Sequence, residues 1–468
     1  MQINCLQASL GYPAELSTEN DSDRMKDIHL QKTIGPFTAT MFGVGAMVGA
    51  GIFVLSGIAA GYAGPAVILA FLLNALVALA IGTCYAELGS AMPRAGGSYF
   101  WVKTALGKPA GFAVGWIGVY ANGIVSALYA LGFGSFFVAL LQRLGLAISD
   151  DYVLVFAVLI TVAITYLQYR GIRDLGIVEN SVTVIKVLLL CVLVVAGFII
   201  FSNSDNVMEK MTPFAPNGAG GVLMAMAVIF VAFEGFEVIT RTGEEMHLPE
   251  KNIPLAIYAS IIISVSLYLL IAVILIAAVS GPGGQSSWQY LGDLGELGMA
   301  TTARQLLPYG DVIFYVAGIA STASAMIAAT YSAVRVTFAL GRAKDLPEVL
   351  ADIHPQYNSP HKAAIACGVI VLAIVMVLPI TEVAGAASQM FALLFAVVCF
   401  AAWRLRSTQP DMVRPFRARL LPLCASVGIL AGLVVMMTLL NISPLAWWIS
   451  FAWLLVGGVI FVFRRPAR

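Results

Sequence analysis

The stretch that decides the fold is GVGAMVGAGIF at residues 43–53. Four of its first nine residues are glycine, and it lies in the middle of the first apolar run that is long enough to cross a bilayer. Glycine weakens a helix, and non-helical backbone at membrane depth is tolerated only where protein buries it or where it lines a cavity. The stretch therefore predicts an interrupted membrane helix whose main-chain atoms form a binding site. A second interruption is needed to complete such a site.

The composition predicts an all-α polytopic membrane protein. Of 468 residues, 60% are hydrophobic and only 11% are charged, against about 25% charged in soluble domains. This leaves no room for a soluble catalytic domain, so neither an enzyme nor a nucleic-acid-binding protein is expected. The six cysteines are scattered, so no metal site or cofactor is expected either. Twelve apolar runs predict transmembrane helices near residues 35–62, 66–88, 111–141, 152–168, 177–201, 218–240, 255–280, 310–340, 363–380, 385–403, 419–440 and 444–463.

The second interruption is predicted in the sixth run, where FEGFE occupies residues 233–237. A charge at mid-membrane costs roughly 2.5 to 3.5 kcal/mol unless water or a partner is available. The first and sixth helices are five apart, so they cross in opposite directions, as in an inverted repeat of five plus five helices. The predicted division is a cytoplasmic tail at 1–34, a first repeat at 35–201, an outer loop at 202–217, a second repeat at 218–403, and two final helices with a short cytoplasmic C-terminus at 404–468.

The positions of the basic residues predict the orientation. With the N-terminus inside, all but four of the 26 lysines and arginines lie in cytoplasmic segments. Lys186 lies within the fifth helix, and Arg143, Lys210 and Arg304 would lie outside. Both termini are therefore expected in the cytoplasm. The Gly-rich connection at 281–308 is expected to be an outer loop of short helices that could act as a lid.

The glycines have two interpretations. Gly45 and Gly49 form a small-xxx-small pair, which could serve helix packing alone. An unwound segment instead exposes amide donors at the start of the second half-helix and carbonyl acceptors at the end of the first. The amides suit a carboxylate and the carbonyls suit an ammonium group. A zwitterion, and therefore an amino acid, is the natural ligand class.

Three motifs resemble those of the amino acid-polyamine-organocation transporter superfamily. They are the glycine stretch followed by Ala-Gly-Pro65, the block YAELGSAMPRAGGSY at 85–99, and EEMHLPEKNIP at 244–254. The resemblance implies alternating access and the same five-plus-five architecture with two added helices. It also implies that the substrate carboxylate meets the amides around Ala50 and Gly51. The amine would meet carbonyls near Met47, Val231 and Glu234.

Lys186 is the candidate coupling residue. The simpler interpretation is that its long side chain snorkels, so that the charged end reaches the cytoplasmic surface of the membrane. Burial in the membrane disfavours a charged lysine, so it could instead lose and regain a proton during transport. In the family, proton-coupled members have a fifth-helix lysine where sodium-coupled relatives bind a cation. The resemblance implies that Lys186 lies against carbonyls of the first helix and hydroxyls of the eighth, such as Ser321 and Ser324.

Two other groups of candidate residues leave alternatives open. Glu234 and Glu237 could bond to backbone donors freed by the broken helix. Glu237 could instead gate the site or relay protons, and Glu234 could favour a cationic substrate or face water. Gly118, Val119 and Asn122 are placed to line the pocket, and small residues there would leave room for a substrate side chain. A core asparagine bonded to a neighbouring helix is the alternative for Asn122.

The sequence thus favours a proton-coupled amino acid symporter in a bacterial cytoplasmic (inner) membrane, with the proton as coupling ion. An exchanger of amino acids or polyamines is the alternative with the same fold. An ion channel would want rings of carbonyls or charges along a continuous pore, and no repeated filter motif occurs. The identity of the substrate and any partner subunit stay open.

Overall fold

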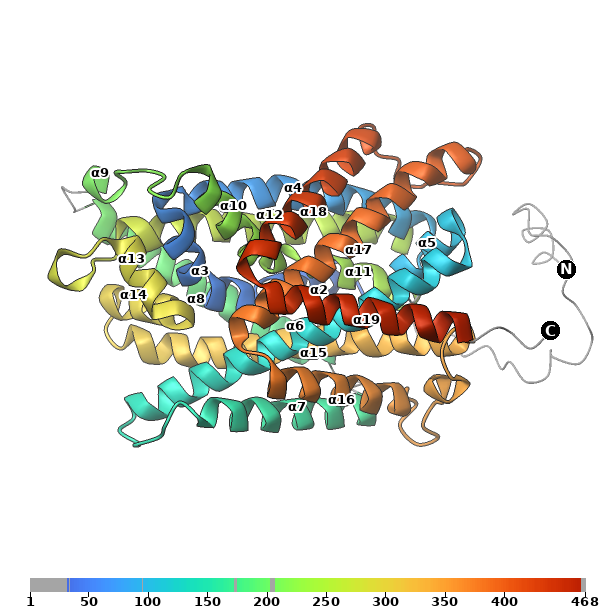
Figure 1. Cartoon of the computed structure of the whole chain (residues 1–468), viewed down its shortest axis with the longest axis horizontal. Helices are drawn as coiled ribbons and strands as arrows, with labels where there is room; N and C mark the ends of the chain where they lie inside the picture. Colours follow the sequence, from blue (N-terminus) through green and yellow to red (C-terminus); the bar gives the residue numbers. More distant parts are fainter. Residues whose placement is uncertain (1–31, 33, 95, 172–174, 203–206, 464–468) are drawn as a thin grey trace, which may run out of the picture. The chain divides into compact units, whose positions relative to one another are not determined.

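The computed structural model describes residues 32, 34–94, 96–171, 175–202 and 207–463. The predicted tail at 1–34 and parts of the predicted loop at 202–217 and C-terminus lie outside these residues. The α-helices, shown in Figure 1, are α2 (Pro36–Met47), α3 (Ala50–Ala63), α4 (Val67–Ala91), α5 (Ser98–Leu106), α6 (Lys108–Arg143), α7 (Tyr152–Arg170), α8 (Leu175–Ser202), α9 (Val207–Lys210), α10 (Gly218–Ile229), α11 (Phe236–Arg241), α12 (Pro249–Ala277), α13 (Ser287–Leu294), α14 (Gly298–Leu306), α15 (Gly310–Arg342), α16 (His361–Val377), α17 (Ile380–Thr408), α18 (Leu421–Ile442) and α19 (Pro444–Phe463). Short 3₁₀ turns are η2 (Gly64–Ala66), η3 (Phe230–Phe233), η4 (Gly243–Glu245), η5 (Pro282–Gly284), η6 (Gly295–Leu297) and η7 (Glu348–Ala351).

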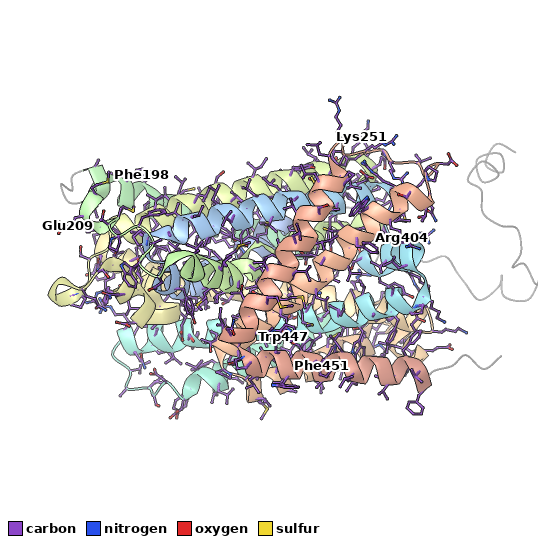
Figure 2. All side chains as sticks on the ribbon, turned by 45° about the horizontal axis from the view of Figure 1, so that its top comes forward. Phe198, Glu209, Lys251, Arg404, Trp447 and Phe451 are labelled. Atoms are coloured by element: carbon purple, nitrogen blue, oxygen red, sulfur yellow. The ribbon has the colours of Figure 1, made fainter. Side chains whose placement is uncertain are left out.

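The predicted all-helical membrane fold is confirmed. No strand occurs in the described ranges. A helix satisfies its backbone hydrogen bonds internally, so it can lie in lipid without unpaired backbone groups. Within the residues that the structure describes, ten helical segments are long and apolar enough to cross a membrane. One of them, Pro36–Ala91, holds the first two predicted spans, and α16 is shorter, at 17 residues. Large apolar side chains point outward from the last helices, among them Phe451 in Figure 2, as a lipid-facing surface requires.

Several helices begin earlier than the sequence predicts, and the difference is largest for α12 and α17. α12 begins at Pro249 rather than near 255, because proline fits the first turn of a helix, where its missing N–H has no partner to lose. α17 begins at Ile380, directly after Pro379, rather than near 385. The predicted short helices in the connection at 281–308 are confirmed as α13 and α14.

The helix bundle has two ends that differ in charge. One end, which we call the lid face, carries α9, α13 and α14 (Figure 1). The opposite end, which we call the basic face, carries α5 and the segment 404–419. Figure 2 shows Glu209 at the lid face and Arg404 and Lys251 at the other end.

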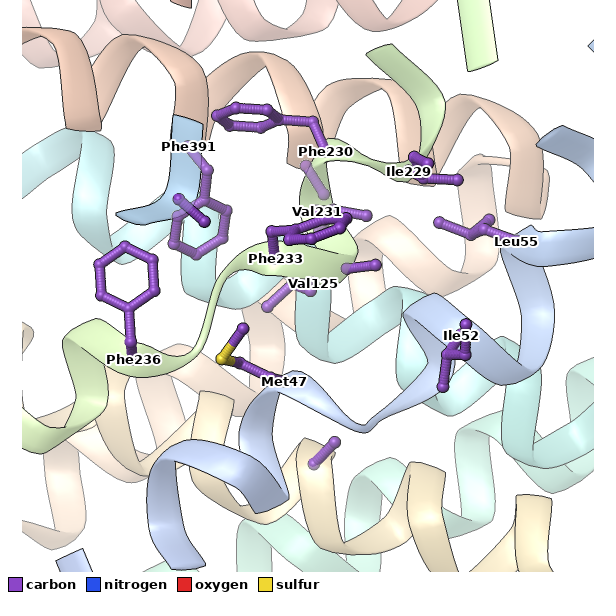
Figure 3. Packing of buried hydrophobic residues seen from close by; sticks show 14 of the residues in the cluster. Met47, Ile52, Leu55, Val125, Ile229, Phe230, Val231, Phe233, Phe236 and Phe391 are labelled. Atoms are coloured by element: carbon purple, nitrogen blue, oxygen red, sulfur yellow. The ribbon is translucent and has the colours of Figure 1, made fainter. Parts of the chain in front are cut away.

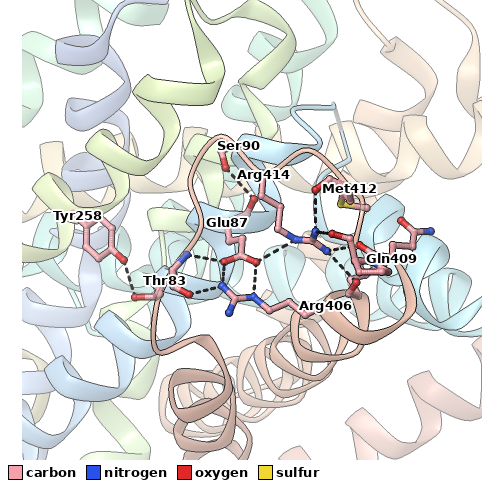
Figure 4. A network of polar contacts seen from close by, with 11 residues as sticks. Thr83, Glu87, Ser90, Tyr258, Arg406, Gln409, Met412 and Arg414 are labelled. Atoms are coloured by element: carbon pink, nitrogen blue, oxygen red, sulfur yellow. Dashed lines mark hydrogen bonds and ion pairs between the residues drawn. The ribbon is translucent and has the colours of Figure 1, made fainter. Parts of the chain in front are cut away.

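A buried carboxylate fastens the basic face. Glu87, near the end of α4, accepts hydrogen bonds from Arg406 and from the Ala418 amide at 2.9 Å, and Arg414 lies 3.4 Å away (Figure 4). The Glu87 side chain is 2% exposed, so its charge is stabilised by these partners rather than by water. The cluster ties α4 to the connection between α17 and α18.

Both predicted interruptions are present. α2 ends at Met47 and α3 begins at Ala50, so Val48 and Gly49 form a break in the first membrane helix. In the sixth, α10 passes into η3, and the extended Glu234 and left-handed Gly235 then separate η3 from α11. Gly235 has φ +116°, a conformation that residues with a side chain rarely adopt.

The two broken helices run in opposite directions. At the basic face, the Ile34 amide donates to the Glu245 carbonyl at 3.0 Å, which joins the start of α2 to the end of α11. At the lid face, Asn217 Nδ2 donates to the Tyr62 carbonyl at 2.8 Å, which joins the end of α3 to the start of α10. The breaks therefore lie opposite each other near the middle of the bundle.

Candidate substrate site

The two breaks are in direct contact. A Cβ built on Gly235 would lie 2.7 Å from the Met47 amide nitrogen, and one built on Gly51 would lie 2.4 Å from the Ala232 side chain. Figure 3 shows Met47 beside this turn, with the apolar side chains of Val231 and Phe233 above it. Glycine is needed at both positions because the backbones approach too closely for any side chain.

The first break contains the backbone groups that the sequence predicts would bind substrate. The Ala50 and Gly51 amides begin α3, and the first amides of a helix have no intrahelical acceptor. They lie at the positive end of the helix dipole, which favours an anion such as a carboxylate. The Met47 carbonyl ends α2 and accepts a bond from the Gly49 amide at 2.7 Å.

A tyrosine that the sequence analysis did not single out bridges the two breaks. The Tyr268 hydroxyl, on α12, lies 2.6 Å from the Met47 carbonyl oxygen and 3.1 Å from the Ala232 carbonyl oxygen. Tyr268 is fully buried, so its hydroxyl needs such acceptors. It holds the carbonyl end of α2 against η3.

Replacing Tyr268 by phenylalanine is expected to lower the free energy of unfolding by about 1 kcal/mol, the usual contribution of one hydrogen bond. The substitution removes the single hydroxyl proton that the Met47 and Ala232 carbonyls share, while packing stays unchanged. Thermal melting in detergent measures the effect. Tyr309→Phe is the matched control, since Tyr309 is 75% exposed and should leave the melting temperature unchanged. Equal melting temperatures for Tyr268→Phe and the wild type would contradict the bridging role.

Lys186 lies between the first and eighth membrane helices, where the resemblance places it. Its Nζ donates to the Gly45 carbonyl at 2.6 Å and lies 3.5 Å from Ser324 Oγ on α15. Ser321, one turn earlier, donates to the Val48 carbonyl at 2.8 Å. Lys186 is 1% exposed, so it does not snorkel to a membrane surface.

The two acidic residues have different environments. Glu237 Oε2 accepts a bond from the Gly235 amide at 2.7 Å, so it caps the start of α11 as one of the two interpretations expects. Glu234 lies at the break itself, and its Oε1 accepts a bond from Tyr129 on α6 at 3.2 Å. Its other oxygen accepts no hydrogen bond from a described residue. Of the two, Glu234 is therefore better placed to meet a ligand.

The third-helix candidates lie on the basic-face side of the breaks. Asn122 donates to the Gly118 carbonyl at 2.7 Å and accepts from Arg241 at 3.0 Å. Val119 packs with Tyr99 and Val336 in a separate apolar cluster. Asn122 thus joins α6 to α11 on the basic-face side of the site. This contact is the alternative to pocket lining that the sequence analysis gives for Asn122.

Further polar residues support the site without having been predicted. Arg241 is 3% exposed and, among the described residues, forms no ion pair. Ser388 on α17 accepts a bond from the Val231 amide at 3.2 Å, which satisfies backbone freed by η3. Arg241 follows the FEGFE motif by one helical turn. That spacing could have indicated that its side chain lies near the second break. Nothing in the sequence near Ser388 links it to Val231.

A charged contact closes the basic-face side of this region. Arg335 on α15 contacts Glu245 at 2.8 Å, and the Tyr331 hydroxyl donates to the same carboxylate at 3.2 Å. Glu245 belongs to η4, immediately after α11, so the contact joins the end of the second broken helix to α15. Separation of α11 from α15 would require this contact to break.

Comparison with known proteins identifies relatives across nearly the whole chain. A profile of the family described as amino acid permease matches residues 34–467. A branched-chain amino acid permease of Bacillus subtilis is 29% identical over 449 residues, which are 92% of each chain. A methylthioribose transporter of the same organism is 27% identical and covers 95% of each chain. The vacuolar cationic amino acid transporter 2 of Arabidopsis thaliana is 28% identical over 83% of this chain and 62% of its own length.

Proposed function

Since the chain belongs to the amino acid permease family, we propose that it is a secondary active transporter that carries amino acids across a membrane by alternating access. The observation that carries the proposal is the contact between two antiparallel interrupted helices. The Gly235 position at one break meets Met47 at the other, and helix-end amides and carbonyls lie beside it. Such paired helix ends suit the carboxylate and ammonium groups of an amino acid.

We propose the same membrane topology and location that the sequence predicts. The chain crosses the membrane twelve times, with inverted repeats at 35–201 and 218–403 followed by two helices. The basic face is cytoplasmic under the positive-inside rule, and the lid face is external. This puts both termini in the cytoplasm of a bacterial cell with the protein in its inner membrane. The opposite directions of α2–α3 and α10–α11 support the inverted repeat.

Lys186 supports proton coupling. Its Nζ donates to the Gly45 carbonyl of the first broken helix, so gain or loss of its proton changes a contact that holds α2. A neutral lysine amine is a weaker donor to a carbonyl than a charged ammonium group. Proton binding and the position of α2 are thereby linked, which is what a symporter requires.

Glu234 favours a cationic substrate as the second candidate. It is a 4% exposed carboxylate at the break, held by one hydrogen bond from Tyr129. A buried acid is stabilised by an opposite charge, and the ammonium or guanidinium group of a substrate side chain would supply one. The transported molecule would then be a lysine-like or arginine-like amino acid, or a polyamine.

Transport into proteoliposomes tests the proposal. Purified protein is reconstituted, and uptake of labelled leucine, arginine and putrescine is measured with and without an inward proton gradient. We expect saturable uptake of at least one of them that the gradient accelerates. Strict dependence on internal unlabelled substrate would instead assign exchange. No saturable flux for any labelled amino acid or amine would contradict the transport function.

A further inference from the structure

A cavity lies beside α3 on the lid-face side of the break. It has a volume of about 180 Å³ and lies between α3, α10 and the ends of α17 and α18. Its floor is made by the buried side chains Leu55, Val228 and Ala384. Its polar lining comes from Tyr62, Thr381, Glu382 and Ser443. The volume corresponds to about six water molecules, which is room for a small amine or one amino acid.

The cavity is separate from the breaks. Leu55 lies more than one helical turn beyond Gly51 along α3, and Val228 precedes η3. In Figure 3, Leu55 lies next to Ile229 and away from Met47 at the break. A molecule in the cavity is therefore close to the substrate site without occupying it.

Glu382 gives the cavity a negative charge. It lies in the first turn of α17, and its Oε2 accepts a bond from the Ala446 amide at 3.1 Å. Its Oε1 accepts no hydrogen bond from a described residue. None of the residues lining the cavity is basic. The carboxylate thus has an unused acceptor in a partly enclosed space where screening by water is reduced.

We propose that this cavity is a binding subsite for a primary ammonium group, held by Glu382. The proposal rests on the proposed transport function. In it, the cationic end of an incoming amino acid or amine binds in this cavity before the molecule reaches the substrate site. Thr381 and Tyr62, which also line the cavity, add hydroxyl groups to its wall. The apolar floor accommodates the aliphatic stem of a lysine-like molecule.

Binding of cadaverine to the purified full chain tests the proposal. Cadaverine carries two primary ammonium groups and no carboxylate, so it reports on ammonium recognition without the helix-end amides. In calorimetric titrations, Glu382→Gln is expected to weaken binding about two- to five-fold, in the range for partly exposed charge pairs. Glutamine keeps an oxygen for the Ala446 amide, so the ends of α17 and α19 stay joined. Glu209→Gln removes an exposed lid-face charge outside the cavity and is expected to bind like the wild type.

Two results would overturn the subsite. The first is equal cadaverine affinity in Glu382→Gln and the wild type, or no binding by the wild type. The second is a loss in Glu382→Asp, which keeps the charge, as large as that in Glu382→Gln. Both results come from binding measurements. They would not contradict the transport function if labelled amino acids are still taken up. An absence of flux with intact, Glu382-dependent cadaverine binding would remove the transport proposal and keep the ammonium subsite.

Discussion

Uptake driven by an inward proton gradient is expected to fall at least about tenfold when Lys186 is replaced by alanine. The substitution removes the ammonium group that donates to the Gly45 carbonyl at 2.6 Å. A hydrogen bond from a charged group contributes about 1.5 to 3 kcal/mol, and 1.4 kcal/mol corresponds to a factor of ten. The measurement is initial uptake of labelled amino acid into proteoliposomes at several pH gradients. The rate should become independent of the gradient.

Two further variants make the result specific. Lys186→Met keeps most of the side-chain volume, so it separates loss of the charge from the cavity that alanine leaves. It should lose proton dependence as Lys186→Ala does. Lys251→Ala removes an exposed lysine at the basic face and should leave the response unchanged. Gradient-driven uptake that persists in both Lys186 variants would rule the lysine out as the coupling group.

Gly235→Ala is expected to reduce transport roughly 100-fold. The backbone at Gly235 has φ +116°, and holding a residue with a side chain in such a region costs about 1 to 3 kcal/mol. The new methyl group would also lie 2.7 Å from the Met47 amide nitrogen, so the two breaks would be forced apart. Because 1.4 kcal/mol corresponds to a factor of ten, a cost of about 3 kcal/mol lowers the fraction of protein with a closed site about 100-fold. Uptake rates normalised to reconstituted protein measure it.

Gly220 offers the matched control. It lies in α10, part of the same broken helix, and a Cβ built there meets nothing within 4 Å. Gly220→Ala should therefore transport at the wild-type rate. Its helix should be slightly more stable, because alanine favours helix more than glycine does. Wild-type transport by Gly235→Ala would show that the breaks do not need this close contact.

The breaks were predictable because they depend on local chemistry. Glycines at 43–51 and the FEGFE motif are unusual within apolar helices, and their meaning can be read from a few adjacent residues. Lys186 was predictable for the same reason, since a lysine within an apolar run needs partners. The resemblance to a known family implied carbonyls of the first helix and hydroxyls of the eighth as partners, without naming the Gly45 carbonyl that Lys186 contacts.

Contacts between distant segments were not predictable from the sequence. Tyr268 reads as an ordinary aromatic residue in an apolar helix, and only the packing of α12 brings it to the Met47 carbonyl. The pairing of Arg241 with Asn122 joins residues 119 positions apart. Each residue fits several environments, and tertiary packing selects one of them. The same holds for Glu382, whose significance comes from helices that enclose it.

The Glu87 cluster also bears on how the chain is assembled during synthesis. Its partners Arg406 and Ala418 follow Glu87 by 319 and 331 residues, so the carboxylate emerges from the ribosome long before they do. Until then the end of α4 carries a charge with no counter-ion from this cluster. Chains that stop short of residue 406 would therefore keep a buried carboxylate without its arginine partners, so their α4 end would be less stable than that of the full chain.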